Sequence, residues 1–168
     1  MRETLIHNHL CRNLGNTPTD DQSAALRKVA EYIFDNSNDV ICVLAGYAGT
    51  GKTSVISTVV RTLDMLRIRS VLMAPTGRAA KVLASYTGKQ AYTIHKKIYR
   101  QKSLKDGTGS FVLDRNLHRN TYFIVDEASM ISNISNDSSL FGSGKLLDDL
   151  IEYVYSGTDC KLIIVGDN

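Results

Sequence analysis

The chain has 168 residues, of which 43% are hydrophobic and 22% charged, and its formal net charge is +3. These values are ordinary for a soluble globular protein, and the length is sufficient for one domain with a hydrophobic core. The small positive charge permits a nucleic-acid partner but does not require one.

Neither a targeting segment nor a disulfide framework is evident. The first seven residues lack the apolar stretch of a signal peptide, and no apolar run reaches the length of a membrane span. The three cysteines, Cys11, Cys42 and Cys160, are far apart and odd in number, which argues against disulfides and against a zinc site. We therefore expect a cytoplasmic protein in a reducing compartment, without a membrane partner.

Helical and strand-like apolar patterns alternate along the chain. In chain order they predict a helix over 22–34, a strand over 40–45, a helix over 55–66, a strand over 71–74, a helix over 78–86, a strand over 122–125, a helix over 146–154 and a strand over 162–165. Strands separated by helices pair in parallel, with helices on both faces of the sheet. The sequence therefore predicts an α/β fold in a single domain over residues 1–168.

Two polar segments interrupt this alternation. Residues 100–120 are basic and contain Asp106-Gly107, a dipeptide that favours a tight hairpin turn, so this segment predicts a small hairpin insertion. Residues 132–144 are rich in Ser, Asn and Gly and predict a loop.

The octapeptide GYAGTGKT, residues 46–53, lies between a predicted buried strand and a predicted helix. Its spacing is that of a P-loop, in which glycines turn backbone N–H groups toward phosphate oxygens at the start of a helix. Lys52 adds a positive charge for the outer phosphates and counts as catalytic, and the Thr53 hydroxyl suits Mg²⁺. The alternative is a glycine-rich turn with a solvated lysine. The residues expected to contact Mg²⁺ and ATP are Gly46, Ala48, Gly49, Thr50, Gly51, Lys52, Thr53 and Ser54.

An acidic pair, Asp126 and Glu127, ends the strand predicted over 122–125. The carboxyl ends of strands are where open α/β sheets bind ligands. We expect Asp126 to hold Mg²⁺ through water and Glu127 to orient and deprotonate the attacking water. The alternative is a solvated acidic pair at a strand end.

Five phrases of the sequence, in this order, resemble superfamily 1 helicases of the RecD-like group. They are GYAGTGKT, APTGRAAKVL (74–83), TIHKKIY (93–99), VDEASMI (125–131) and VGDN (165–168), and the likeness covers residues 17–168. The resemblance implies a RecA-like P-loop motor domain that binds ATP, Mg²⁺ and single-stranded DNA. It further implies translocation in the 5′ to 3′ direction.

The resemblance also assigns roles to individual residues. It implies that Gln22 hydrogen-bonds the adenine base and that Asp167 belongs to the motif coupled to the γ-phosphate. For Gln22 a structural alternative stays open, because Thr19-x-x-Gln22 is also a capping box at a helix start.

Four further residues match motifs that contact the nucleic acid in the family. The resemblance implies that Thr76 and Arg78 lie near the nucleic-acid backbone and that Thr93 and His95 contact the same ligand. The alternatives are a solvated arginine and a structural histidine.

The family pattern continues beyond the GD of residues 166–167 with a glutamine that senses the γ-phosphate, whereas this chain stops at Asn168. The resemblance therefore implies a fragment of a longer helicase. Its second RecA-like domain, with an arginine finger, would be absent here, and the fragment alone would not unwind DNA. Recombination or replication proteins are possible partners.

Two other functions remain open from the residues alone. One is a small P-loop kinase that phosphorylates a nucleoside, and the other is a nucleotide-dependent binding module without turnover. His7, His9 and Cys11 resemble a metal-ligand cluster, but no second ligand pair follows at zinc spacing, so we interpret them as a chance grouping in a polar N-terminal flank.

Overall fold

The computed structural model describes residues 2–37, 40–102, 110–131 and 140–167, and its centre is a five-stranded parallel sheet. The strand order is β1 (Ile41–Ala45), β7 (Lys161–Gly166), β6 (Thr121–Val125), β2 (Arg69–Ala74) and β3 (Ala91–Thr93). All four pairings are parallel. The prediction of an α/β fold with a parallel sheet is confirmed.

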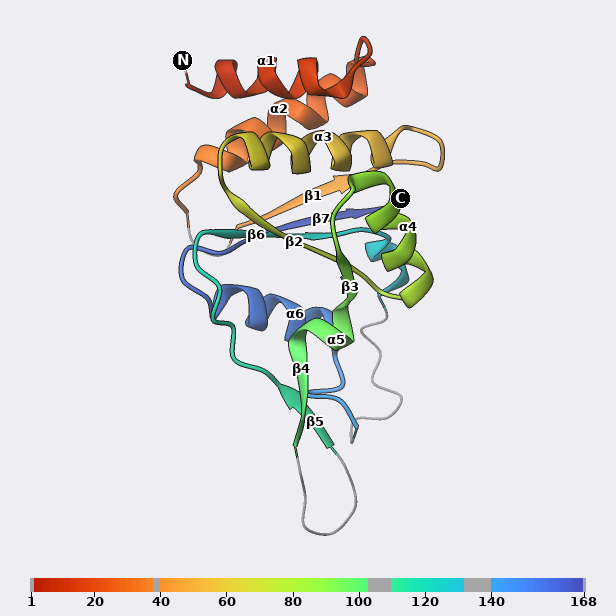
Figure 1. The fold of residues 1–168 in the computed structure, drawn as a ribbon, viewed down its shortest axis with the longest axis vertical. Helices are drawn as coiled ribbons and strands as arrows, with labels where there is room; N and C mark the ends of the chain where they lie inside the picture. The colour runs from red at the N-terminus through yellow and green to blue at the C-terminus, as the bar shows by residue number, and fades with distance from the viewer. Residues whose placement is uncertain (1, 38–39, 103–109, 132–139, 168) are drawn as a thin grey trace.

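Helices cover both faces of this sheet (Figure 1). On one side lie α1 (Arg2–Leu14), α2 (Asp20–Phe34) and α3 (Lys52–Met65), and α4 (Gly77–Thr87) packs beside α3 over β2 and β3. On the other side lie α5 (Ile94–Ile98) and α6 (Leu146–Tyr155). Within the described residues, no helix is both long and apolar enough to cross a membrane.

The sequence of β6 is apolar at successive positions because this strand lies in the centre of the sheet. All five of its residues are buried, because helices cover both of its faces and strands pair with both of its edges. Ile124 faces the core cluster that includes Leu26, Ile56 and Leu63, whereas Phe123 faces the opposite cluster with Leu150 and Leu162. The alternating side chains of one strand therefore join the two halves of the core.

Helix α1 corrects the interpretation of the N-terminal residues as a polar flank. Ile6 and Leu10 are buried, and since they are four positions apart they lie on one face of the helix. His7 and Cys11 lie one turn apart on α1, with the His7 ring nitrogen 3.6 Å from Cys11 Sγ. The helix was missed because its apolar stripe is narrow and most of its other residues are polar.

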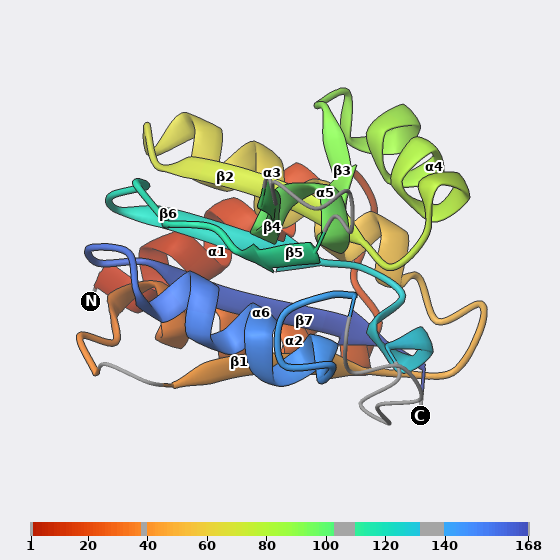
Figure 2. The same cartoon turned by 90° about the horizontal axis from the view of Figure 1, so that it is seen from below.

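An antiparallel pair, β4 (Tyr99–Lys102) and β5 (Ser110–Leu113), projects from the side of the sheet covered by α5 and α6 (Figures 1 and 2). Phe141 stacks on Phe111 with ring centroids 4.5 Å apart, and the Phe111 N–H donates to the Leu140 carbonyl at 2.8 Å. The pair is thus joined to the segment that leads into α6. The predicted Asp106-Gly107 turn and most of the predicted 132–144 loop lie outside the described residues.

Candidate nucleotide and magnesium site

The predicted nucleotide-binding residues meet at one edge of the sheet because β1, β6 and β7 are parallel and end there. Ala45 is in register with Gly166, and Val125 with Ile164. The Gly46 N–H donates to the Gly166 carbonyl at 3.2 Å, which joins the start of the P-loop to the end of β7. The carboxyl edge of a parallel sheet is the usual ligand-binding edge of such folds.

The loop over 46–51 turns directly into α3. Gly49 and Gly51 have φ angles of 82° and 85°, a backbone region that glycine enters without the steric cost of a side chain. Gly51 is the N-cap of α3 and supplies no side-chain cap, so the N–H groups of the first helical turn keep the capacity to bind an anion. This is the arrangement that a phosphate-binding loop requires.

The Lys52 ammonium group lies within this loop. Its Nζ donates to the carbonyls of Gly46 and Tyr47 at 2.7 and 2.8 Å and lies 2.6 Å from Asp167 Oδ1. The side chain is only 20% exposed, compared with 47% for Asp167. Lys52 is therefore held at the mouth of the loop by oxygen atoms that a phosphate group would partly replace.

Gln22 performs the capping role and contacts the P-loop at the same time. Its Oε1 accepts from the Thr19 N–H at 3.1 Å, and Thr19 Oγ1 accepts from the Gln22 N–H at 3.2 Å. Its Nε2 donates to the Thr50 carbonyl at 3.2 Å. A Cβ atom on Gly51 would lie 2.3 Å from this amide nitrogen. The capping box is present, and it places the amide of Gln22 against the loop.

A pocket of about 470 Å³ lies beside the loop, between α2 and β1. Its lining includes Gln22, Tyr47, Thr50 and Lys52, and the Tyr47 side chain is 71% exposed. The volume is in the range of small-molecule sites, roughly 300–1,000 Å³. Tyr47 is thus a residue at this site that the P-loop pattern alone, which leaves its position unspecified, did not single out.

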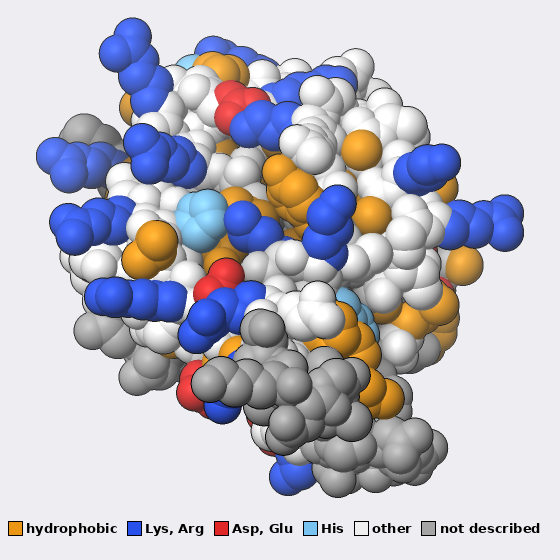
Figure 3. Space-filling view, turned by 60° about the horizontal axis from the view of Figure 1, so that its bottom comes forward, with side chains coloured by type: hydrophobic (Ala, Val, Ile, Leu, Met, Phe, Trp, Pro, Cys, Tyr) orange, Lys and Arg blue, Asp and Glu red, His pale blue; other side chains and the backbone are white. Residues whose placement is uncertain are grey.

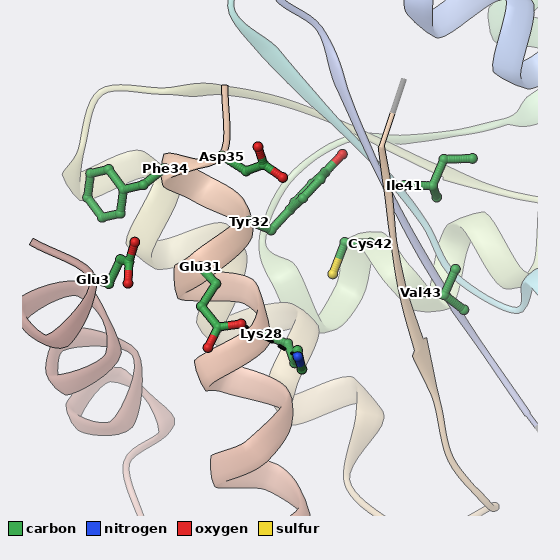
Figure 4. A pocket seen from close by; sticks show the side chains of 9 residues that line it. All are labelled: Glu3, Lys28, Glu31, Tyr32, Phe34, Asp35, Ile41, Cys42 and Val43. Atoms are coloured by element: carbon green, nitrogen blue, oxygen red, sulfur yellow. Dashed lines mark ion pairs between the residues drawn. The ribbon is translucent and has the colours of Figure 1, made fainter. Parts of the chain in front are cut away.

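Another pocket, of about 490 Å³, lies along α2 and β1 but holds no predicted site residue (Figure 4). Lys28 and Glu31 form an ion pair of 3.6 Å on its α2 side. Cys42 also lines it, and burial raises the pKa of this thiol to about 11, so the thiol stays protonated at neutral pH. Pocket volume therefore does not single out the candidate nucleotide site, whereas the P-loop and Lys52 do.

The acidic pair is held in a defined geometry at the end of β6. Asp126 Oδ2 accepts from the Tyr86 hydroxyl at 2.5 Å, and Oδ1 accepts from the Glu127 N–H at 2.9 Å. Glu127 is exposed and has a φ angle of 55°, which is uncommon for a residue with a side chain. It precedes the short 3₁₀ helix η1 (Ala128–Met130). Backbone of this kind clusters at functional sites, although Arg67, Asn120 and Asp159 have similar φ angles elsewhere in the chain.

The chemistry of the two predicted donors, the Thr53 hydroxyl and the Asp126 carboxylate, suits Mg²⁺. Thr53 lines a pocket of about 210 Å³ together with Tyr86, and Tyr86 hydrogen-bonds Asp126. One hydroxyl and one carboxylate are sufficient for Mg²⁺ at a nucleotide site, because this ion keeps several of its waters and takes further oxygens from phosphates. Among the described residues, no group of three or more His, Cys, Asp and Glu side chains is placed to hold a metal ion by itself.

The four residues assigned to nucleic acid occupy helix starts next to this edge. Thr76 caps α4 by accepting from the Ala79 N–H at 3.2 Å, and Thr93 caps α5 by accepting from the Lys96 N–H at the same distance. Arg78 is exposed in the first turn of α4. His95 is half-buried, its ring lies 5.0 Å from that of Phe141, and burial lowers its pKa. The structure thus gives local roles to both threonines and a packing role to His95, and their contact with nucleic acid remains a prediction.

Tyr86 is a second site residue that sequence reasoning missed. It is forty positions from Asp126, on α4, and its half-buried ring packs against the core between the sheet and α1, α2 and α3. Burial, the hydrogen bond to Asp126 and the nearby negative charges of Asp126 and Glu127 raise its pKa. No local motif marks such a contact, because it depends on how α4 packs on β2, the strand that pairs with β6.

Comparison with known proteins places these features in a family. A family profile that describes an AAA domain matches residues 17–168. The chain is 28% identical over 169 residues to the uncharacterized protein R530 of Acanthamoeba polyphaga mimivirus, an alignment that covers 87% of this chain and 31% of that protein.

Two relatives have names that state a function. The multifunctional conjugation protein TraI of Escherichia coli K12 is 33% identical over 128 residues, or 68% of this chain and 6% of TraI. The ATP-dependent RecD2 DNA helicase of Deinococcus radiodurans is 39% identical over 56 residues, or 33% of this chain and 8% of RecD2. The chain thus spans less than a third of each relative. The likeness is to helicase-like P-loop domains rather than to RecD-like proteins alone.

Proposed function

This chain belongs to the AAA-domain family of P-loop NTPases, and we propose that it is the ATP-binding motor domain of an ATP-dependent DNA helicase. The observation that carries the proposal is the start of α3. There, two glycines with positive φ angles lead into an uncapped helix whose first residue, Lys52, already lies among oxygen atoms.

In this proposal, different residues of the site bind the phosphates, hold Mg²⁺ and activate the attacking water. The backbone N–H groups of residues 46–54 bind the phosphates, and Lys52 exchanges Asp167 for the outer phosphate oxygens. Thr53 and, through a water molecule, Asp126 would hold Mg²⁺, which would supply neutralisation of the phosphate charge. Glu127 orients a water molecule and accepts its proton. The exposure of Glu127 at the strand end supports this role, because the side chain is accessible to solvent and ligand.

Single-stranded DNA is the proposed polymer. The likeness to the RecD2 DNA helicase supports this choice. Seen from the side of the β4–β5 pair, the surface carries many more Lys and Arg than Asp and Glu side chains, which suits a phosphate backbone (Figure 3). We assign Arg78, Thr76, Thr93 and His95 to this contact. Arg78, which is exposed, is the member of this set that is free to pair with phosphate.

In this proposal, hydrolysis and unwinding require a second domain of a longer parent protein. A second RecA-like domain of the parent binds the other side of ATP, and RecD-like translocation in the 5′ to 3′ direction belongs to both domains together. Recombination or replication proteins are the proposed partners. The short share of each relative that this chain covers is compatible with such a division.

Thermal unfolding with nucleotide tests the proposal directly. At a hundredfold excess over Kd, Mg-ATP stabilises the folded state by about 2.7 kcal/mol, which raises the Tm of a domain of this size by roughly 5–10 °C. Lys52→Ala should remove most of this shift. Lys145→Ala, at an exposed ion pair with Asp148, is the matched control and should keep it. An unchanged wild-type Tm at millimolar Mg-ATP would contradict nucleotide binding.

A further inference from the structure

We propose that Tyr86 is a positioning residue for Mg²⁺, holding the Asp126 carboxylate in the orientation that accepts from a metal-bound water. This inference rests on the proposed function, because it assigns Mg²⁺ to Asp126. No P-loop motif contains Tyr86, which reaches the site from a different helix.

Both oxygens of the Asp126 carboxylate are held, and from different sides. The Glu127 N–H donates to Oδ1 at 2.9 Å and the Tyr86 hydroxyl donates to Oδ2 at 2.5 Å. Two hydrogen bonds to the two oxygens fix the rotation of the carboxylate about its terminal bond. Each oxygen has a second lone pair, so the held carboxylate keeps acceptor capacity for a metal-bound water.

Tyr86 is itself anchored, which makes its hydroxyl a fixed donor. Its ring packs against the core beneath α3 and α4, and its carbonyl accepts from the Ser57 hydroxyl of α3 at 3.2 Å. α4 ends one residue later at Thr87, followed by Gly88 with a φ angle of 70°. The helix end and the bond to α3 therefore set where the hydroxyl lies.

Two buried tyrosines of the described chain use their hydroxyls differently, whereas the Tyr99 hydroxyl also donates to a carboxylate, Asp149 Oδ2, at 2.5 Å. Tyr32 donates to the Val40 and Leu162 carbonyls, and Tyr122 donates to the Ile33 carbonyl. Backbone partners of this kind satisfy a buried hydroxyl and join elements of the fold. Tyr86 bonds the carboxylate that directly follows β6, and it lines the pocket that Thr53 of α3 also lines. Since the Tyr99–Asp149 bond only joins β4 to α6, a role toward the metal is indicated by the position of the Tyr86–Asp126 bond and not by its chemical type.

The hydroxyl contributes by preorganisation. A carboxylate already fixed in the metal-binding orientation loses little rotational freedom when the hydrated ion arrives. Partners that orient metal ligands typically account for 10–100-fold in metal affinity or activity. Because Asp126 acts through water, we expect an effect on Mg²⁺ affinity at the lower end of this range, about tenfold.

The test is Tyr86→Phe, which keeps the packed ring and removes only the hydroxyl. With the nucleotide-binding domain held at saturating ADP, the Mg²⁺ concentration that gives half of the metal-dependent rise in Tm should increase about tenfold. The affinity for ADP measured by calorimetry in EDTA should stay at the wild-type value. Outside α4, the hydrogen bonds of Tyr86 are to Ser57 and Asp126, neither of which belongs to the P-loop over 46–53.

Tyr122→Phe is the matched control, because it removes a tyrosine hydroxyl whose partner, the Ile33 carbonyl, lies away from the site. It should lower the Tm without nucleotide but leave the Mg²⁺ titration unchanged. If Tyr86→Phe behaves like this control, Tyr86 only joins α4 to β6 and the inference is overturned. Failure of the wild-type chain to bind ADP in either buffer would instead overturn the proposed function.

Discussion

At the scale of single residues, the candidate site is held by contacts that a bound phosphate would rearrange. Lys52 is paired with Asp167 at 2.6 Å and bonded to two loop carbonyls. A bound phosphate must draw the ammonium from Asp167, so part of the phosphate attraction offsets the loss of this ion pair. The advantage is that the lysine side chain is already folded into the loop and loses little further conformational freedom on binding.

Gly51 is the P-loop position where a side chain is least tolerable. Alanine there must adopt a left-handed backbone, which costs roughly 1–2 kcal/mol, and its Cβ would lie 2.3 Å from Gln22 Nε2. We expect Gly51→Ala to lower the free energy of unfolding by at least that amount in urea titration and to abolish the Mg-ATP shift. Gly77→Ala, with nothing within 4 Å of the added Cβ, should leave both unchanged. Equal behaviour of the two variants would contradict the geometry of the loop.

Glu127 is the proposed general base. The substitution Glu127→Gln keeps the size of the side chain but removes the carboxylate that accepts the proton. In the two-domain parent protein we expect this variant to bind ATP normally and to lose at least about 10²-fold in turnover, the usual contribution of a general base. Single-turnover hydrolysis measures the chemical step, and nucleotide affinity is measured in parallel. Wild-type turnover in this variant would show that the base is another group. Asp126→Asn is the comparison variant, because it should instead raise the Mg²⁺ concentration that ATP binding requires.

At the scale of elements, one residue at the N-terminus of α2 both stabilises this helix and contacts the candidate nucleotide site. The capping box satisfies the first N–H groups of the helix, and the same glutamine reaches the P-loop. The two readings of the Thr19-x-x-Gln22 pattern are therefore compatible in this geometry. The amide oxygen caps the helix while the amide nitrogen, now on the Thr50 carbonyl, faces the loop.

A pair of substitutions separates these two functions of α2. Gln22→Glu keeps a capping oxygen but loses the amide donor, so we expect normal stability and weaker binding of ATP, measured by calorimetry. Thr19→Ala removes the other half of the box and should cost about 1 kcal/mol of stability with little effect on ATP affinity. If Gln22→Glu binds ATP as tightly as wild type, the donor does not serve the nucleotide.

At the scale of the whole molecule, α1 belongs to the same folded unit as the P-loop domain although it precedes the family match at residue 17. It packs on α2 and α3, and Asn13 Nδ2 donates to Thr62 Oγ1 of α3 at 2.9 Å. Leu10 is 0% exposed within the cluster that also includes residues of β6 and β7. The helix thus closes the core that supports the loop.

Leu10→Ala tests whether α1 contributes to global stability. Removing a fully buried leucine side chain costs about 2–5 kcal/mol, and we expect this loss in a single cooperative transition followed by circular dichroism and by tyrosine fluorescence. Leu5→Ala is the matched control on the same helix, because Leu5 is 59% exposed, and its effect should be within about 0.5 kcal/mol. A separate early transition for Leu10→Ala would show that α1 unfolds independently.

The sequence by itself determined the parallel α/β sheet and the P-loop. Strands buried on both faces are apolar at successive positions, as in Tyr122 to Val125, and the alternation with helical periods excludes antiparallel hairpins for these strands. The P-loop was readable because its residues are adjacent in the chain and their chemistry depends on local backbone geometry, the positive φ angles of Gly49 and Gly51 above all. The α1 helix and the short β3 strand were missed, since a narrow apolar stripe and a three-residue strand give little periodicity.

Only the tertiary structure decided which distant side chains meet. It brought the hydroxyl of Tyr86 to Asp126, the amide of Gln22 to Thr50 and Lys52 to Asp167. It also placed His95 against Phe141, in a packing contact that the TIH phrase does not reveal. Each of these contacts joins residues from different elements, and it depends on strand order and on the angle at which helices pack. A local pattern specifies neither, because both result from burying the whole core at once.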